Sequence, residues 1–307
     1  MNEKVSVLQV DNLSVSFSMY NKGLSKRDLE VIHELSIDVK KGEIVAVVGS
    51  SGSGKSLLAH AIMGILPENS KTKGSIKYYN DELNEKYLRK VRGKDIAFIP
   101  QSVDFLDPLM KVGKQVVGIN GNKERQKEVF KKYNLDDKVA EMYPFQLSGG
   151  MARRVLIATA VMNEAKLIIA DEPTPGLNLE LAMETLNNFR EIADSGCGVL
   201  LITHDVDLAL NVADRVAVFY SGTIVEIAKV EDFIKGKDAL RHPYSKAFID
   251  ALPQNKFKEL PGYQPYAGNL PKGCLFRDRC SLKTDECCME IKMRKIRDGE
   301  VRCINAT

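Results

Sequence analysis

The chain has 307 residues, of which 44% are hydrophobic and 28% are charged. This length favours one main domain with an appendage, and the composition is typical of a soluble chain with a well-filled core. A formal net charge of only +3 argues against a protein that binds nucleic acid. Because the sequence has neither an apolar run of membrane-spanning length nor a secretory signal, we expect a cytosolic chain.

The predicted elements begin with two alternating segments and continue with buried strands and helices. Residues 8–17 and 31–39 alternate apolar and polar side chains, which is typical of an antiparallel sheet. Buried strands are predicted at 43–48, 95–99, 166–170 and 198–203, and helices at 55–66, 149–163 and 179–193. Because strands that alternate with helices form parallel sheets covered on both faces, the sequence predicts an α/β fold.

The remaining segments differ from this alternation. The charged segment 123–142 has helical period and predicts a smaller helical subdomain, and a short helix is expected around Pro243. Residues 253–273 are rich in proline and glycine, so no regular structure is expected there. Cys197 stands alone in an apolar context, but the other five cysteines lie within the last 34 residues. Such clustering in a reducing compartment indicates a separate C-terminal module.

A phosphate-binding loop is the most specific motif. Residues 49–56 fit the pattern G-x-x-x-x-G-K-[ST] directly after a predicted strand and at the start of a predicted helix. Loop amides would wrap the phosphates, while Lys55 would reach the β- and γ-phosphates and Ser56 would ligate Mg²⁺. The predicted nucleotide-binding residues are Gly49, Ser50, Ser51, Gly52, Ser53, Gly54, Lys55 and Ser56. This loop alone fits kinases, GTPases and motors equally well.

Acidic residues at the end of a later strand narrow the choice among these classes of nucleotide-binding protein. Asp171 and Glu172 follow the apolar run 167–170, at the strand edge where ligands bind in open α/β sheets. We expect Asp171 to hold Mg²⁺ through water and Glu172 to activate the attacking water as general base. His204 ends the next predicted strand, where it is placed to sense the γ-phosphate.

The segment Leu147-Ser-Gly-Gly-Met151, followed by a helix, resembles the signature of ATP-binding-cassette (ABC) ATPases. The other motifs fall in this family's order, and the resemblance covers residues 5 to about 240. It implies an ABC-type nucleotide-binding domain with a RecA-like parallel core, an antiparallel β subdomain and an α-helical subdomain at about 102–163. It also implies that Phe17 stacks on adenine, with Tyr20 as a rival, and that Gln101 contacts nucleotide and Mg²⁺.

In this family the signature acts on ATP bound to the opposite subunit, so Ser148, Gly149 and Gly150 would complete a partner's site. A chain with one phosphate loop and one signature must therefore pair, and the expected partner is a second ABC ATPase in a heterodimer. One departure concerns Asn178, which stands where the family usually has an aspartate. Asparagine keeps hydrogen bonding but loses the charge, so communication between the two sites is expected to differ.

The region 241–307 resembles the C-terminal extension of ATPases that serve dipeptide, oligopeptide and nickel importers. In that group four cysteines of the extension resemble ligands of a 4Fe–4S cluster. The matching residues here are Cys274, Cys280, Cys287 and Cys303. Thiolates at this spacing suit either an iron–sulfur cluster or zinc, and both alternatives stay open. Cys288 adjoins Cys287 and is a rival for the third ligand.

The predicted protein is a peripheral ATPase subunit at the cytoplasmic face of the membrane. Residues 1–240 form the cassette, and residues 241–307 form the cysteine-containing extension. The resemblance implies ATP, Mg²⁺ and a 4Fe–4S cluster as cofactors. It implies as partners two transmembrane permeases and an extracellular binding protein of a peptide, nickel or metal-chelate importer. The alternatives are an ABC ATPase outside transport, in DNA repair or on ribosomes, and a degenerate cassette in an asymmetric pair.

Overall fold

The computed structural model describes residues 5–20, 25–50, 52–118, 121–252, 254–255 and 257–307. Its strands are β1 (Ser6–Tyr20), β2 (Lys26–Lys40), β3 (Ile44–Val48), β4 (Ser70–Tyr78), β5 (Asp81–Glu82), β6 (Ile96–Ile99), β7 (Leu167–Asp171), β8 (Gly198–Thr203), β9 (Arg215–Tyr220), β10 (Thr223–Lys229), β11 (Arg294–Ile296) and β12 (Gly299–Val301). Its α-helices are α1 (Lys55–Met63), α2 (Glu85–Val91), α3 (Val112–Val117), α4 (Lys123–Lys132), α5 (Gly149–Val161), α6 (Leu179–Asp194), α7 (Val206–Leu210), α8 (Val230–Ile234) and α9 (Pro243–Asp250). No helix in these ranges is long and apolar enough to cross a bilayer.

The larger sheet positions the predicted site. In the described ranges its strand order is β11-β12-β10-β9-β3-β8-β7-β6, and the strands from β9 to β6 run parallel. The parallel core expected from the sequence is confirmed. Val48 is paired with Thr203, and Ile202 with Asp171. The carboxyl ends of β3, β8 and β7 therefore meet at one edge, which brings together the segments that follow them.

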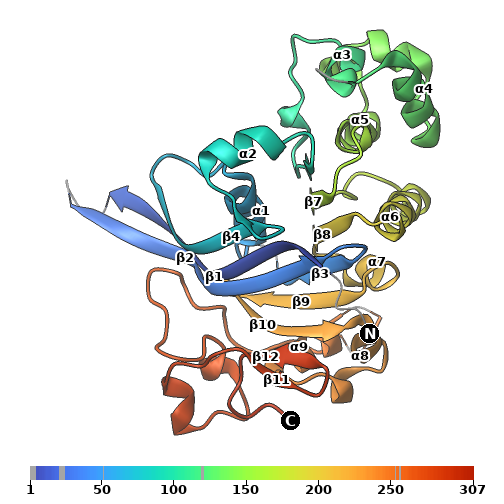
Figure 1. Cartoon of the computed structure of the whole chain (residues 1–307). Coiled ribbons are helices and arrows are strands. Elements are labelled where there is room, and N and C mark those ends of the chain that lie inside the picture. Colours follow the sequence, from blue (N-terminus) through green and yellow to red (C-terminus); the bar gives the residue numbers. More distant parts are fainter. Residues whose placement is uncertain (1–4, 21–24, 51, 119–120, 253, 256) are drawn as a thin grey trace.

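The smaller sheet covers one face of the larger one. Its order is β2-β1-β4-β5 with antiparallel pairing throughout the described ranges, which confirms the sheet expected from the alternating segments. Alternate β1 residues are buried on each side of a register shift, Leu8 with Val10 before it and Leu13 with Val15 after it. They share one apolar core with α1 and with Val45 and Val47 of β3. Figure 1 shows this blue sheet crossing in front of β3.

The predicted helical subdomain lies beyond β6. Helices α3, α4 and α5 stand together there (Figure 1), and the buried side of α5 joins the core beneath β6 and β7. The charged segment 123–142 is not one helix: α4 ends at Lys132, and a 3₁₀ turn follows at Asp137–Glu141. Asn134 adopts a positive φ of 51°, which breaks the helix, and Asp136 caps the following turn.

The C-terminal region continues the larger sheet. The hairpin β11–β12 pairs with β10, so residues far apart in sequence lie side by side at the lower edge in Figure 1. Arg241 is buried and forms ion pairs with Glu226 on β10 and Asp232 on α8. The short helix expected around Pro243 is confirmed as α9. The boundary at residue 240 stays a prediction.

Candidate functional site

The predicted phosphate loop connects β3 to α1. Gly54 caps α1 with a φ of 102°, and Gly52 has a φ of 72°, backbone conformations that glycine adopts without strain. A side chain at Gly49 would collide with the carbonyl of Phe219 on β9, so close packing requires glycine there. Ser53 is buried in the loop. Ser51 lies outside the described residues.

Lys55 is buried at the first position of α1. Its ammonium group donates to the carbonyl oxygens of Gly49 and Ser50, each at 2.9 Å. Burial lowers the pKa of Lys55, and the carboxylates of Glu172 and Asp171 act in the opposite direction. The cation thus lies between the loop and the acidic strand end, where it can compensate phosphate charge.

Asp171 ends β7 and fits the role of a Mg²⁺ site reached through water. Its side chain is buried, and among the residues that the structure describes neither carboxylate oxygen has a hydrogen-bond partner at ordinary distance, although the Ser56 hydroxyl lies near. Burial raises the pKa of Asp171, and the charge of Glu172 adds to this effect, whereas the nearby Ser56 hydroxyl opposes it. A buried carboxylate without a partner is costly, so a hydrated cation beside Ser56 would satisfy both groups.

Glu172 and His204 contact each other directly. Nδ1 of His204 lies 2.8 Å from Oε2 of Glu172, although they are 32 residues apart in sequence. The Glu172 side chain is only 8% exposed, whereas that of His204 is 60% exposed. Glu172 also has a positive φ of 49°, a strained conformation for a residue with a side chain. The parallel register of β7 and β8 therefore builds a carboxylate–imidazole pair, although the sequence did not indicate this contact.

Gln101 follows β6, and its backbone is held by a residue that the motif search missed. Arg153 is buried on α5, and its guanidinium donates to the carbonyl oxygens of Pro100 at 2.8 Å and Gln101 at 2.5 Å. The helical period could have identified this residue as buried. Arg153 lies four residues before the fully buried Ile157, so both fall on the buried side of α5.

The predicted signature lies at the start of α5. Ser148 caps the helix, and its hydroxyl accepts from the amide of Met151 at 3.2 Å. A Cβ built at Gly149 would meet no described atom within 4 Å, whereas one at Gly150 would lie 3.7 Å from the carbonyl oxygen of Gly176. Figure 1 shows α5 in the helical layer, apart from α1. The signature and the phosphate loop of one chain therefore face different surroundings.

Three further residues singled out by the sequence, Phe17, Tyr20 and Asn178, lie outside the phosphate loop and the acidic strand end. Phe17 on β1 is half-buried against the core, whereas its rival Tyr20 is 70% exposed and has the ammonium of Lys26 over its ring. Asn178 caps α6, because its side-chain oxygen accepts from the amide of Leu181 at 2.9 Å. Its helix-capping role needs no negative charge.

The four predicted cysteine ligands lie near one another. All six cysteines are free thiols, and Cys287 and Cys303 are buried. Burial raises the pKa of Cys274 to about 11, and the other three thiols of the set add to this shift. The four are therefore close enough to interact electrostatically. Cys288 is exposed instead, and its sulfur accepts from Arg277 at 3.2 Å.

The cysteine set does not form a ready-made site for a single ion. Within the described ranges, no group of three or more His, Cys, Asp or Glu side chains is placed to hold a metal ion. A metal site in the extension is therefore not shown. Four free thiols that influence one another are donors that either an iron–sulfur cluster or zinc would use, so the donor set does not separate the two.

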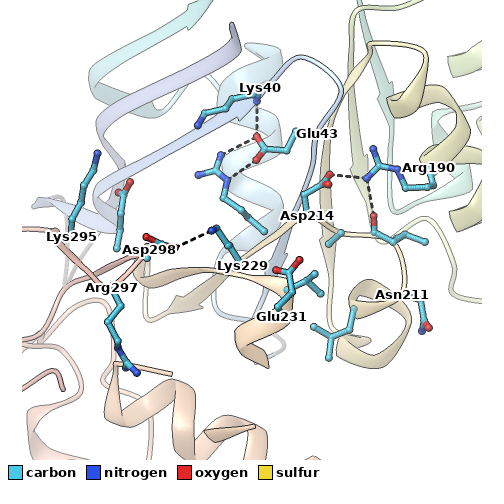
Figure 2. Close-up of a pocket in the computed structure, with 17 residues that line it drawn as sticks. Lys40, Glu43, Arg190, Asn211, Asp214, Lys229, Glu231, Lys295, Arg297 and Asp298 are labelled. Carbon is cyan, nitrogen blue, oxygen red and sulfur yellow. Dashed lines mark hydrogen bonds and ion pairs between the residues drawn. The ribbon is translucent and has the colours of Figure 1, made fainter. Parts of the chain in front are cut away.

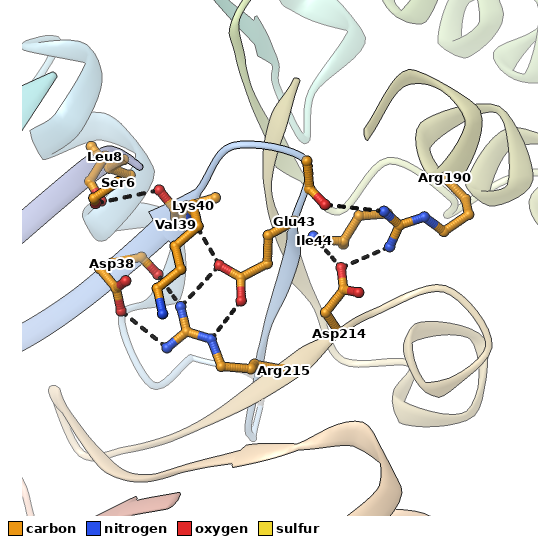
Figure 3. Close-up of polar contacts among 11 residues, drawn as sticks. Ser6, Leu8, Asp38, Val39, Lys40, Glu43, Ile44, Arg190, Asp214 and Arg215 are labelled. Carbon is orange, nitrogen blue, oxygen red and sulfur yellow. Dashed lines mark hydrogen bonds and ion pairs between the residues drawn. The ribbon is translucent and has the colours of Figure 1, made fainter. Parts of the chain in front are cut away.

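A large hollow lies away from the phosphate loop. It has a volume of about 1050 Å³ and is lined by charged side chains of β2, β9, β10 and the β11–β12 hairpin (Figure 2). Several of these charges are already paired: Arg190 with Asp214 at 2.7 Å, and Lys229 with Asp298 at 3.1 Å. Figure 3 shows that Arg215 likewise bridges Asp38 and Glu43. This hollow is lined by structural ion pairs and holds none of the predicted site residues.

The C-terminal region touches the phosphate loop. The hydroxyl of Ser50 donates to the side-chain oxygen of Gln264 at 3.0 Å. Arg279, which lies between Cys274 and Cys280, donates to the carbonyl oxygens of Leu260 at 3.0 Å and Pro261 at 2.9 Å. The irregular segment expected at 253–273 therefore connects the cysteine region to the predicted nucleotide site.

Comparisons with known proteins agree with this geometry. Residues 32–175 match the ABC transporter family, and residues 225–287 match the family described as "Oligopeptide/dipeptide transporter, C-terminal region". The dipeptide transport ATP-binding protein DppD of Haemophilus influenzae is 32% identical over 97% of this chain and 95% of its own length. DppD of Bacillus subtilis is 35% identical over 92% of this chain and 88% of its own length.

Solved structures show the same fold. A dimeric ATP-binding cassette, MJ0796, is 26% identical and superimposes with a TM-score of 0.65 over 73% of this chain and 98% of its own. The same cassette in a post-hydrolysis state bound to ADP and Pi gives a TM-score of 0.64 at 25% identity. The chain therefore belongs to the family of ABC transporter ATP-binding proteins, and it is an ATPase.

Proposed function

We propose that this chain powers the import of a dipeptide or oligopeptide by hydrolysing ATP in a binding-protein-dependent transporter. The observation that carries the proposal is the edge of the larger sheet, where Lys55, Asp171 and the Glu172–His204 pair gather around the phosphate loop. Relatives named as dipeptide transport ATP-binding proteins match nearly the whole chain, which supports a peptide as cargo.

Each predicted residue has a role in this proposal. The phosphate loop and Lys55 hold the phosphates, while Ser56, Gln101 and Asp171, the last through water, hold Mg²⁺, which would neutralise phosphate charge. Glu172 accepts a proton from the attacking water, and His204 orients Glu172 through their hydrogen bond. Phe17 stacks on the adenine. Ser148, Gly149 and Gly150 contact the ATP of a partner cassette, as in the family that the signature resembles, and the space beside Gly149 among the described residues leaves room for it.

The proposed assembly contains two ATPases and two permeases. Since the signature and the phosphate loop of one chain face different surroundings, a second ABC ATPase completes each site. We propose a heterodimer, because Asn178 lacks the charge that the family usually has there. The permeases receive the movement at the cytoplasmic face of the membrane, and an extracellular binding protein delivers the cargo.

The extension is proposed to hold a 4Fe–4S cluster through Cys274, Cys280, Cys287 and Cys303. The mutual electrostatic influence of these thiols supports the ligand set, and the contact of Cys288 with Arg277 supports Cys287 as the third ligand. Zinc is the alternative occupant. Either occupant would bind thiolates and tie the extension together.

Two substitutions in the assembled transporter test the proposed site. Glu172→Gln should leave the ATP dissociation constant within about twofold but slow hydrolysis by about 10² to 10⁴, because only the general base is lost. Lys55→Ala should instead weaken ATP binding about tenfold or more, since charge-assisted hydrogen bonds to phosphate disappear. Nucleotide titration and phosphate release measure the two effects.

The proposal fails if Glu172→Gln turns over at the wild-type rate, or if Lys55→Ala binds ATP normally. Uptake into proteoliposomes with labelled dipeptide, oligopeptide or Ni²⁺ tests the cargo separately. We expect ATP hydrolysis by the same proteoliposomes to increase when peptide is added and not to increase when Ni²⁺ is added. Stimulation by Ni²⁺ alone would overturn the peptide assignment and leave the ATPase intact.

A further inference from the structure

Arg153 is a charged side chain buried beside the predicted catalytic carboxylates. It is only 6% exposed and lies on α5, five residues after the helix cap Ser148. Its two terminal nitrogens donate to two successive carbonyl oxygens, those of Pro100 and Gln101, in a forked arrangement. The planar guanidinium suits such a pair of acceptors, and an ammonium cannot reproduce it.

Its surroundings also explain how the charge is tolerated. Burial lowers the pKa of Arg153, and the carboxylates of Glu172 and Asp171 act in the opposite direction. A buried cation is stable only with hydrogen bonds and compensating charge, and here the loop carbonyls supply the first and the acidic strand end the second. One side chain therefore joins the signature helix to the Gln101 loop through hydrogen bonds, within electrostatic reach of the acidic strand end.

We propose that Arg153 is a positioning residue for ATP hydrolysis, which holds the Gln101 loop in place against the signature helix. The fork occupies backbone oxygens, so the side chain of Gln101 stays available for nucleotide and Mg²⁺. This inference rests on the proposed nucleotide site.

Substitutions of Arg153 in the assembled transporter separate the effect of its two forked hydrogen bonds from the effect of its positive charge. Arg153→Lys keeps the charge but loses the fork, and Arg153→Met loses both. We expect kcat to fall about tenfold in the lysine variant and about a hundredfold in the methionine variant, as for loss of charged hydrogen bonds. The ATP dissociation constant should stay within about threefold, because Arg153 contacts no phosphate-loop residue through these bonds. The Mg²⁺ concentration for half-maximal rate should rise, because Gln101 is displaced.

The matched control is Arg125→Gln on α4, which removes an arginine from the same helical subdomain. Arg125 is exposed and pairs with Glu128 at 3.3 Å, so kcat and the Mg²⁺ requirement should stay at wild-type values. Thermal unfolding identifies variants that fail to fold. If Arg153→Met does not fold, Arg153→Lys carries the test, since it fills nearly the same volume.

A double-mutant cycle with Gln101→Ala distinguishes positioning from a general structural role. If Arg153 acts through Gln101, then adding Arg153→Lys to Gln101→Ala should lower kcat by less than about twofold further. Independent, multiplicative losses would overturn the proposal, as would a wild-type kcat and Mg²⁺ requirement in Arg153→Lys. Failure of the proposed nucleotide site gives a different result, because Glu172→Gln would then hydrolyse ATP at the wild-type rate or Lys55→Ala would bind ATP normally.

Discussion

His242 is buried as a neutral imidazole at the start of α9. Its Nδ1 accepts from the amide of Tyr244 at 2.9 Å, and burial lowers the pKa of His242 to about 3. The unfolded chain binds a proton below about pH 6.5, whereas the folded chain does not. This histidine therefore stabilises the fold fully above pH 6.5, and the contribution is lost progressively as the pH falls towards 3.

Denaturant unfolding at two pH values tests this residue. When the pH is lowered from 7.5 to 5.5, the unfolding free energy should fall by about 1.4 kcal/mol because of His242. The fall arises because the unfolded chain, but not the folded chain, binds a proton over about one pH unit of this range. His242→Asn keeps a side-chain acceptor for the cap but cannot titrate. The variant should therefore lose about 1.4 kcal/mol less unfolding free energy than the wild type over the same pH range. Equal losses in both proteins would contradict a neutral buried His242.

At the residue scale, motif spacing was enough to find residues whose chemistry defines the site. The sequence placed Asp171, Glu172 and His204 at strand ends and Lys55 at the helix start that follows another strand, and the parallel register brings these strand ends to one edge. The contact between His204 and Glu172 was not predictable, because it depends on side-chain direction across two strands. Arg153 was missed because no motif assigns it chemistry, although its helical period marked it as buried.

At the scale of elements, an ion-pair cluster joins β2, the turn before β3 and β9 (Figure 3). The Arg215 side chain on β9 is 17% exposed; it donates to both oxygens of Glu43, at 2.7 and 3.0 Å, and to Asp38 on β2 at 3.0 Å. Burial acts to lower the pKa of Arg215, but Glu43 and Asp38 raise it overall. The cluster therefore ties the smaller sheet to the parallel core.

Arg215→Met should destabilise the protein by about 3–5 kcal/mol, because the side chain of Glu43 is nearly buried and would lose its counter-charge. The matched control is Arg190→Met: its partner Asp194 is 66% exposed and Asp214 40% exposed. We expect a loss of only about 1 kcal/mol there. Urea unfolding measures both values, and equal losses would show that burial of Glu43 does not matter.

Element types were predictable where the apolar pattern was strong. The run from Ile44 to Val48 is buried on both faces, and its sequence already indicated a central strand. The hairpin β11–β12 was not predicted, because its short, charged strands carry no alternating pattern. Their structure comes from pairing with β10, a contact between residues more than 70 positions apart. Such tertiary pairing overrides local preference.

At the scale of the whole molecule, the extension is connected to the phosphate loop in three steps. The thiols of Cys274 and Cys280 flank Arg279, whose guanidinium holds the carbonyl oxygens of Leu260 and Pro261. A few residues later Gln264 accepts from Ser50 of the phosphate loop. One continuous segment with these hydrogen bonds therefore links the cysteine region to the phosphate loop.

The cysteine region is expected to hold a 4Fe–4S cluster. Protein purified without oxygen should be brown and contain about four irons per chain, as four-thiolate ligation of a 4Fe–4S cluster implies. Zinc would instead give colourless protein with about one metal ion per chain. Absorbance and metal analysis separate the two, and protein that contains neither iron nor zinc would remove the site.

Ligand variants then show whether the metal orders the segment that reaches Ser50. Cys287→Ser should lose the metal, expose residues 253–273 to limited proteolysis and leave the cassette folded, because metal binding is coupled to local folding. Cys288→Ser is the matched control: its sulfur faces Arg277, so metal content and protease resistance should stay unchanged. The reverse pattern would move the third ligand to Cys288. If Cys287→Ser lost the metal but kept both protease resistance and ATP affinity, the cluster would not support the contact with the phosphate loop.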